Sequence, residues 1–256
     1  MGKRKRPRGG KASPTSKPKN SIAQDYCSQK YWESRYENEQ KEQSQAFEWF
    51  FTYKQIKPVI KYHFNSKIKR KECSCLDLGC GNSNLLFDMR ADGFLGNLVG
   101  VDYSQTVISY MNNKNGFENI RYEVLDVTNG FPYKDASYDV CIDKSTMDTI
   151  LHNTTEGEQK VAKMISEISR ILRYNGFYLL LTQMDFEKEA DYEFFVNVVL
   201  STLQSSSELA HWKLTVHSSA EYPLHVYVFE KLKCHEMSRR SGEKSPVVIL
   251  KSLNYD

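Results

Sequence analysis

The segment from Cys75 to Ser83, CLDLGCGNS, constrains the fold more than any other, because it joins an apolar run to a Gly-x-Gly turn and a helical pattern. This order predicts a buried strand, a tight turn and a helix start, the arrangement of nucleotide-type cofactor loops. Glycine lacks a Cβ atom, so Gly79 and Gly81 let the backbone turn sharply and approach a ligand closely. A purely structural turn is the simpler interpretation of a lone Gly-x-Gly motif. Asp102, which lies 21 residues after Gly81 at the end of a second apolar run, favours the cofactor loop, because its carboxylate can accept both hydroxyls of a ribose.

The residues around the glycines indicate which cofactor this loop binds. Asn84 stands where a dinucleotide fingerprint requires a third glycine, and no Lys-Ser or Lys-Thr pair follows as in a phosphate-binding P-loop. The acid before the first glycine, Asp77, would repel a pyrophosphate but suits an ammonium or sulfonium group. S-adenosylmethionine carries such a cation beside a ribose and an adenine, so we expect it to be the cofactor.

Strand and helix patterns alternate along most of the chain, which predicts an α/β fold with a doubly wound, mostly parallel, seven-stranded sheet and helices on both faces. The expected strands are Ser74–Leu78, Leu98–Asp102, Ile120–Leu125, Tyr138–Ile142, Phe177–Thr182, Trp212–His217 and His225–Lys231, the last two forming a hairpin around Tyr222-Pro223. The expected helices are 26–42, 54–64, 85–92, 105–113, 158–173 and 189–203.

Charge divides the chain unevenly. Residues 1–20 carry eight Lys or Arg and no acid, whereas the remainder has 27 basic and 32 acidic residues, a net of −5. We expect residues 1–22 to be a disordered basic tail, residues 23–233 the folded domain and residues 234–256 a C-terminal tail. The basic tail gives two further possibilities, a nuclear localisation signal and a weak RNA contact; otherwise we expect no nucleic-acid partner.

The six cysteines form no CxxC pair, so no metal site is expected, and buried reduced thiols in the cytoplasm are the ordinary interpretation. No apolar run approaches the roughly 18 residues that span a membrane. We expect a monomer.

Four motifs together resemble one family. They are Tyr31-Trp32-x-x-Arg35-Tyr36, the Leu-Gly-Cys-Gly-Asn-Ser loop, Val101-Asp102-Tyr103-Ser104 and Asp143-Lys144-Ser145-Thr146-Met147-Asp148. With them, residues 26–231 resemble the class I, seven-β-strand methyltransferases that use S-adenosylmethionine, and more narrowly the lysine methyltransferases of translation elongation factor 1-alpha and citrate synthase. Two positions depart from that subfamily: Ser145 replaces its usual Gly, and Met147 its usual Leu or Trp.

The resemblance implies a Rossmann-like methyltransferase fold, a protein substrate such as elongation factor 1-alpha, and a set of site residues. The implied cofactor-binding residues are Trp32, Tyr36, Trp49, Asp77, Gly79, Gly81, Asp102, Tyr103, Asp126, Val127 and Lys144. Of these, Asp126 and Val127 would bind the adenine, and the three aromatic residues Trp32, Tyr36 and Trp49 would close over the cofactor. Asp143 and Asp148 would steer the incoming amine as catalytic residues.

Simpler interpretations stand beside these roles. Asp126 also suits a turn, and Asp143 and Asp148 suit helix capping. A small-molecule or nucleic-acid methyltransferase on the same fold is an alternative, although the Asn/Asp-Pro-Pro-aromatic segment of amino-methylating nucleic-acid enzymes is absent. A non-catalytic cofactor-binding module is a second alternative.

Overall fold

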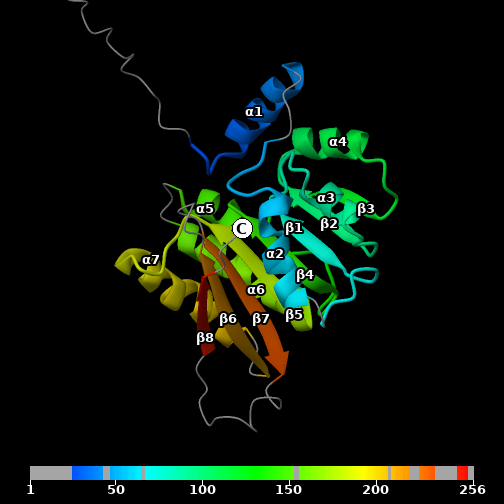
Figure 1. Ribbon diagram of the computed structural model, residues 1–256. Helices are drawn as coiled ribbons and strands as arrows, with labels where there is room; N and C mark the ends of the chain where they lie inside the picture. The colour runs from blue at the N-terminus through cyan, green and yellow to red at the C-terminus, as the bar shows by residue number, and fades with distance from the viewer. Residues whose placement is uncertain are drawn as a thin grey trace, which may run out of the picture.

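The computed structural model describes residues 25–42, 47–64, 67–152, 156–206, 209–218, 225–233 and 247–252. The predicted basic tail, residues 1–22, and the predicted turn at Tyr222-Pro223 lie outside these ranges. The described residues form one mixed sheet with the strand order β3-β2-β1-β4-β5-β7-β6-β8 (Figure 1). The predicted doubly wound α/β fold is therefore confirmed.

All seven predicted strands are present. Five are parallel: β1 (Cys75–Leu78), β2 (Leu98–Asp102), β3 (Ile120–Val124), β4 (Tyr138–Lys144) and β5 (Leu172–Thr182). The hairpin strands β6 (Ala210–Ser218) and β7 (His225–Lys233) are antiparallel to each other, and β7 runs antiparallel to β5. An eighth strand, β8 (Val247–Ser252), lies within the segment expected to be a tail and pairs in parallel with β6 at the edge of the sheet.

Helices cover both faces of the sheet. One face packs against α1 (Gln29–Lys41), α2 (Tyr53–Phe64), α3 (Leu85–Ala91) and α4 (Gln105–Lys114). The other packs against α5 (Thr146–Leu151), α6 (Gly157–Ile171) and the continuous helix of α7 (Glu189–Phe194), the π-helical η1 (Phe195–Leu200) and α8 (Ser201–Ser205). Only α5 was not expected from the sequence.

The sheet core explains the uninterrupted apolar strands. In β1, Cys75 packs into the core on the α2 side, whereas Leu76 and Leu78 pack into the core on the α6 side. A strand covered on both faces cannot alternate between apolar and polar residues, so it reads as a continuous apolar run. Asp77 interrupts this run in β1, and it is therefore buried.

The order of the strands reverses at β1, and this reversal positions the site. The chain runs outward from β1 through β2 to β3 and then crosses back to β4 on the other side of β1. Leu78 pairs with Val101 of β2 and with Asp143 of β4, so Gly79, Asp102 and Lys144 reach the same edge of the sheet. Ligands of open α/β sheets bind at such a switch in strand order.

Candidate functional site

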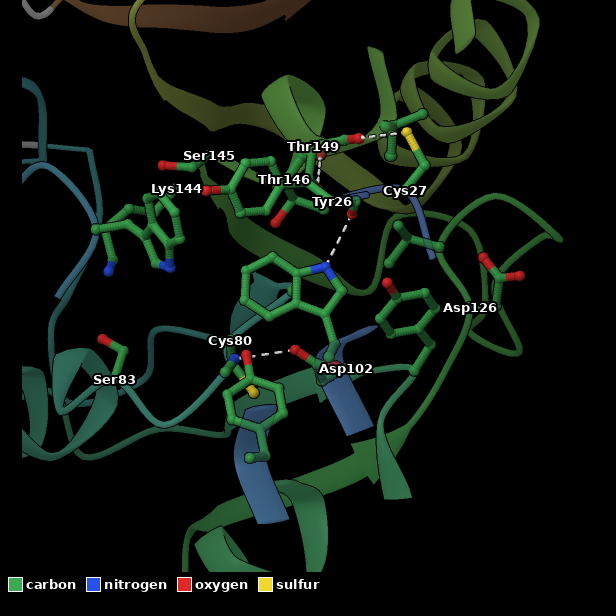
Figure 2. A pocket seen from close by; sticks show the side chains of 18 of the residues that line it. Tyr26, Cys27, Cys80, Ser83, Asp102, Asp126, Lys144, Ser145, Thr146 and Thr149 are labelled. Carbon is green, nitrogen blue, oxygen red and sulfur yellow. Dashed lines mark hydrogen bonds between the residues drawn. The ribbon is translucent and has the colours of Figure 1, made fainter. Parts of the chain in front are cut away.

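A cavity of about 190 Å³ lies beyond the carboxyl ends of β1, β2 and β4 (Figure 2). Its walls come from the glycine turn, from the ends of neighbouring strands, and from the segment that precedes β1. Ten of the predicted site residues line it: Trp32, Tyr36, Trp49, Gly79, Gly81, Asp102, Tyr103, Asp126, Val127 and Lys144. Three do not line it, namely Asp77, Asp143 and Asp148.

The turn after β1 requires its two glycines. Gly79 and Gly81 adopt left-handed φ angles of +63° and +51°. A Cβ atom on Gly79 would lie 2.1 Å from Thr146 Oγ1, and one on Gly81 would lie 2.8 Å from the Tyr36 hydroxyl. Neither position has room for a side chain, because the turn packs closely against Thr146 and Tyr36.

Asp102 is oriented by the backbone around it. Its Oδ2 accepts a hydrogen bond from Gly81 N at 3.1 Å (Figure 2), and its Oδ1 accepts one from Ser104 N at 2.9 Å. Burial raises the pKa of Asp102 to about 6, so the carboxylate is ionised at neutral pH. Each oxygen keeps acceptor capacity for one more donor, which fits the two hydroxyls of a ribose.

At the adenine end of the predicted site, Asp126 both forms a turn and lines the cavity. Its Oδ1 accepts hydrogen bonds from Thr128 N at 2.9 Å and from Thr128 Oγ1 at 2.7 Å, and its Oδ2 accepts one from Asn129 Nδ2 at 2.6 Å. The carboxylate therefore stabilises its own turn. Asp126 and Val127 nevertheless line the cavity, with Tyr103 beside them.

Residues 25–42 and 47–51, called the lid below, cross the cavity. Trp32 and Tyr36 lie one helical turn apart on α1 and are both buried. The Trp32 indole lines the cavity, and its Nε1 donates to Tyr26 O at 2.8 Å. Trp49 lies 6.0 Å from Trp32, measured between ring centroids, so the predicted aromatic residues form one cluster over the glycine turn.

Three glutamates that the sequence analysis did not single out attach the lid. Glu33 accepts hydrogen bonds from Ser104 Oγ at 2.8 Å and from Gln105 N at 2.9 Å, at the positive N-terminus of α4. Glu39 accepts one from Asn82 Nδ2 at 2.9 Å. Glu48 accepts hydrogen bonds from the glycine turn and from Lys144. For Glu48, the signal in the sequence was a single acid within the aromatic run from Phe47 to Phe51.

Asp77 lies beneath the glycine turn instead of in the cavity. Burial raises its pKa to about 7, and the neighbouring Lys144 acts in the opposite direction. Direct cofactor contact by Asp77 stays a prediction.

Asp143 caps a helix. Its Oδ1 accepts hydrogen bonds from Thr146 N at 2.8 Å and from Met147 N at 3.2 Å, at the start of α5. Burial raises its pKa to about 7, and the nearby Asp148 carboxylate raises it further. Asp148 in turn accepts from Thr182 Oγ1 at 2.8 Å. These contacts agree with the capping interpretation, and catalytic roles for the two acids stay predictions.

The two departures from the family pattern lie in different surroundings. Ser145 has a φ of 72°, a left-handed conformation that glycine adopts without strain. Met147 is fully buried in the core on the α6 side, so it packs against apolar side chains instead of facing the cavity.

Within the described ranges, no group of three or more His, Cys, Asp or Glu side chains is placed to hold a metal ion. No helix among these residues is both long and apolar enough to cross a membrane.

Comparison with known proteins agrees with this geometry. A family model described as "Methyltransferase domain" matches residues 69–241, more than half of the chain. The [4+2]-cyclase SpnF superposes with a TM-score of 0.50 at 13% identity, over 73% of this chain and 72% of that chain, which shows a shared fold alone.

Two curated relatives are similar over longer stretches. An "eEF1A lysine and N-terminal methyltransferase" of Xenopus laevis is 27% identical over 233 residues, covering 86% of this chain but only 30% of that protein. An "EEF1A lysine methyltransferase 2" of Danio rerio is 30% identical over 172 residues, covering 64% of this chain and 72% of that protein. The match to the family model, the strand order and the glycine turn bonded to Asp102 lead to one conclusion: the chain belongs to the methyltransferase domain family, with S-adenosylmethionine as its cofactor.

Proposed function

We propose that this protein transfers a methyl group from S-adenosylmethionine to a lysine side chain of a protein, with translation elongation factor 1-alpha as the first candidate substrate. The observation that carries the proposal is the continuous cavity that joins Asp102, suited to a ribose, to Lys144 and Thr146 of the Asp-Lys-x-Thr-x-Asp segment. The names of the two curated relatives point to the same acceptor. The net charge of −5 outside residues 1–20 also favours a basic partner surface.

Methyl transfer needs positioning more than acid–base chemistry. The cofactor supplies the electrophilic methyl group. Orienting two reactants can contribute about 7–11 kcal/mol in favourable cases. A lysine amine must lose its proton before it can attack, since its ordinary pKa is about 10.4. The aromatic wall of Tyr26, Trp32 and Trp49 excludes water and disfavours a buried ammonium, so it promotes that loss.

Labelling with tritiated S-adenosylmethionine tests the proposal. The protein is incubated with recombinant elongation factor 1-alpha and, separately, with a cell lysate, and methylated residues are located by mass spectrometry. We expect label on a lysine of the elongation factor. An Asp102→Ala variant that is folded but binds cofactor weakly is the control for enzyme-dependent labelling.

The other outcomes separate the alternatives. Label on a lysine of another protein would keep the reaction and discard the named substrate. Label only in RNA or small molecules would reject lysine methylation, and binding of cofactor without any labelling would favour a non-catalytic module.

We also propose that the enzyme acts as a monomer in the cytoplasm, with the basic residues 1–20 as a possible nuclear signal. A fluorescent fusion with and without those residues tests the location, and sedimentation of the purified protein tests the assembly state.

A further inference from the structure

The carboxylate of Glu48 joins three parts of the cavity wall. Its Oε2 accepts a hydrogen bond from Ser83 Oγ at 2.7 Å and an ion-paired one from Lys144 Nζ at 2.9 Å, and its Oε1 accepts one from Asn84 N at 2.7 Å. Glu48 belongs to the lid, Ser83 and Asn84 to the turn that opens α3, and Lys144 to the end of β4. One side chain thus connects the lid to two of the elements that carry predicted cofactor contacts.

The ion pair lies in a poorly solvated place. The Lys144 side chain is 7% exposed and that of Glu48 is 19% exposed. Glu48 is the one carboxylate among the described residues that bonds Lys144 Nζ. Removing one partner of a buried ion pair destabilises a protein strongly, because the other charge is left buried and unpaired. Glu48 therefore fixes where the Lys144 ammonium lies in the cavity wall.

The lid and the glycine turn line the same cavity. A Cβ atom on Gly81 would lie 2.8 Å from the Tyr36 hydroxyl, and Trp32 and Trp49 of the lid line the cavity together with Gly79 and Gly81. Moving residues 47–51 away breaks all three Glu48 contacts together, since they converge on one carboxylate. Glu33 and Glu39 hold a different part of the lid, on α1, and neither bonds Lys144.

We propose that Glu48 is a positioning residue for the cofactor: its carboxylate holds the lid against the glycine turn, fixes Lys144, and so controls how fast cofactor and product leave. The inference depends on the cofactor and not on the identity of the methyl acceptor. Glu48 does not line the cavity itself, so it acts through Lys144 and the lid.

The test compares Glu48→Gln, which keeps the shape of the side chain and removes its charge, with Glu37→Gln. Glu37 is an exposed lid glutamate, so its substitution is the matched control. Calorimetry measures the Kd of S-adenosylmethionine. Stopped-flow tryptophan fluorescence measures the release of S-adenosylhomocysteine, because Trp32 and Trp49, two of the three tryptophans in the chain, line the cavity.

For Glu48→Gln we expect release about tenfold faster and a Kd about tenfold higher, with an unfolding temperature within a few degrees of the parent. In the protein without cofactor, amide hydrogen exchange should accelerate at residues 47–51 and at Asn84, and remain unchanged in β5 and β7. Glu37→Gln should match the parent in every measurement. Glu48→Asp keeps the charge on a shorter side chain and should recover part of the slow release.

A second measurement separates positioning from general destabilisation. If Glu48 acts partly through Lys144, the effects of the two substitutions on the Kd overlap. The double variant Glu48→Gln/Lys144→Met should then raise the Kd by less than the product of the two single fold-changes. Release, Kd and exchange equal to the parent in Glu48→Gln would overturn the inference. Because these measurements use cofactor alone, a failure to methylate lysine would reject the proposed function and leave this inference standing.

Discussion

At the residue scale, Ser145 occupies a position whose left-handed backbone conformation is unfavourable for residues other than glycine. It connects β4 to α5 in the left-handed region, and its buried Oγ has no hydrogen-bond partner among the described residues. The Asp143 carboxylate, and not the Ser145 hydroxyl, accepts the free amides at the start of α5. Both facts indicate that the serine contributes little that a glycine would not.

Ser145→Gly should therefore stabilise the protein. A left-handed conformation costs an ordinary L-residue roughly 1–2 kcal/mol, and glycine avoids that cost. After allowing for the extra freedom of glycine in the unfolded chain, we expect the free energy of unfolding in urea to rise by about 1 kcal/mol.

Ser104→Gly is the matched comparison, because Ser104 has a φ of −80° and its hydroxyl accepts from Val107 N at the start of α4. We expect that substitution to lower the free energy of unfolding. A loss of stability in Ser145→Gly of similar size would contradict the strain argument.

The raised pKa of Asp102 predicts how the affinity for cofactor depends on pH. Burial raises its pKa to about 6, and hydroxyl donors bind the ionised carboxylate better than the neutral acid. Affinity for S-adenosylmethionine should be constant above pH 7 and should fall toward tenfold per unit as the pH drops below 6. Calorimetry between pH 5 and pH 8 measures this.

Asp102→Asn, which has no titrating group, should bind weakly with little of that pH dependence. If the parent protein showed the same affinity at pH 5 as at pH 8, the ionised Asp102 would not be the ribose acceptor.

At the scale of elements, the lid is a separate layer attached by polar contacts. Its aromatic side chains pack over the glycine turn, while Glu33 and Glu48 bond the starts of α4 and α3. Burial by itself would raise the pKa of Glu33. Hydrogen bonds from Thr106, Ser104 and Gln105 outweigh this effect and lower the pKa of that carboxyl. The lid is thus anchored to helix N-termini, where carboxylates are favoured.

Truncation tests the role of the lid. Removing residues 1–20 should leave cofactor binding intact, because no described cavity residue lies there. Removing residues 1–40 deletes Trp32, Tyr36 and Glu33 and should abolish binding, as judged by calorimetry on proteins with the circular dichroism of a folded α/β domain. Equal binding by both truncated proteins would mean that these residues are only core.

Regular elements were predictable from the sequence because their periodicity comes from burial on both sheet faces. The start of β5 was not, because polar Arg173 and Asn175 and then Gly176 interrupt its pattern, and Asn175 adopts a left-handed φ of 64°. Helix α5 was missed because six residues are too few to show a helical period, although the Asp143 carboxylate caps its start locally.

The candidate site was also only partly predictable from the sequence. Sequence spacing located the glycine turn and Asp102, which act through the backbone and the ends of strands. It could not find Glu33, Glu39 or Glu48, because their partners lie on elements far along the chain. Asp77, suited to a sulfonium, and Asp143 and Asp148, implied by the resemblance, do not line the cavity, and their roles stay predictions.

At the scale of the whole molecule, β8 covers an edge of the sheet. It pairs in parallel with β6 over six residue pairs, from Lys213–Val247 to Ser218–Ser252. Without it, the backbone amides and carbonyls of β6 would be open to pairing with another chain.

Ending the chain after Lys233 should therefore lower the urea midpoint and promote self-association, seen by light scattering. Cofactor affinity should stay within about twofold, because β6 and β1 are separated by β4, β5 and β7. Ile249→Pro keeps the full length and places a proline within β8, and we expect it to act in the same direction. A truncated protein with parental stability and no association would show that β8 does not protect the edge.

The contacts of the lid also set an order for folding. Glu33 meets Ser104 across 71 positions of the chain, Glu48 meets Lys144 across 96, and Cys27 meets Thr149 across 122. Closing such long loops is entropically costly unless the intervening β1 to β4 framework already holds their ends together. On a ribosome, residues 25–51 emerge before every strand of the sheet, yet they cannot dock until about residue 150 has been made. The lid is thus synthesised before the sheet but docks after the sheet has formed.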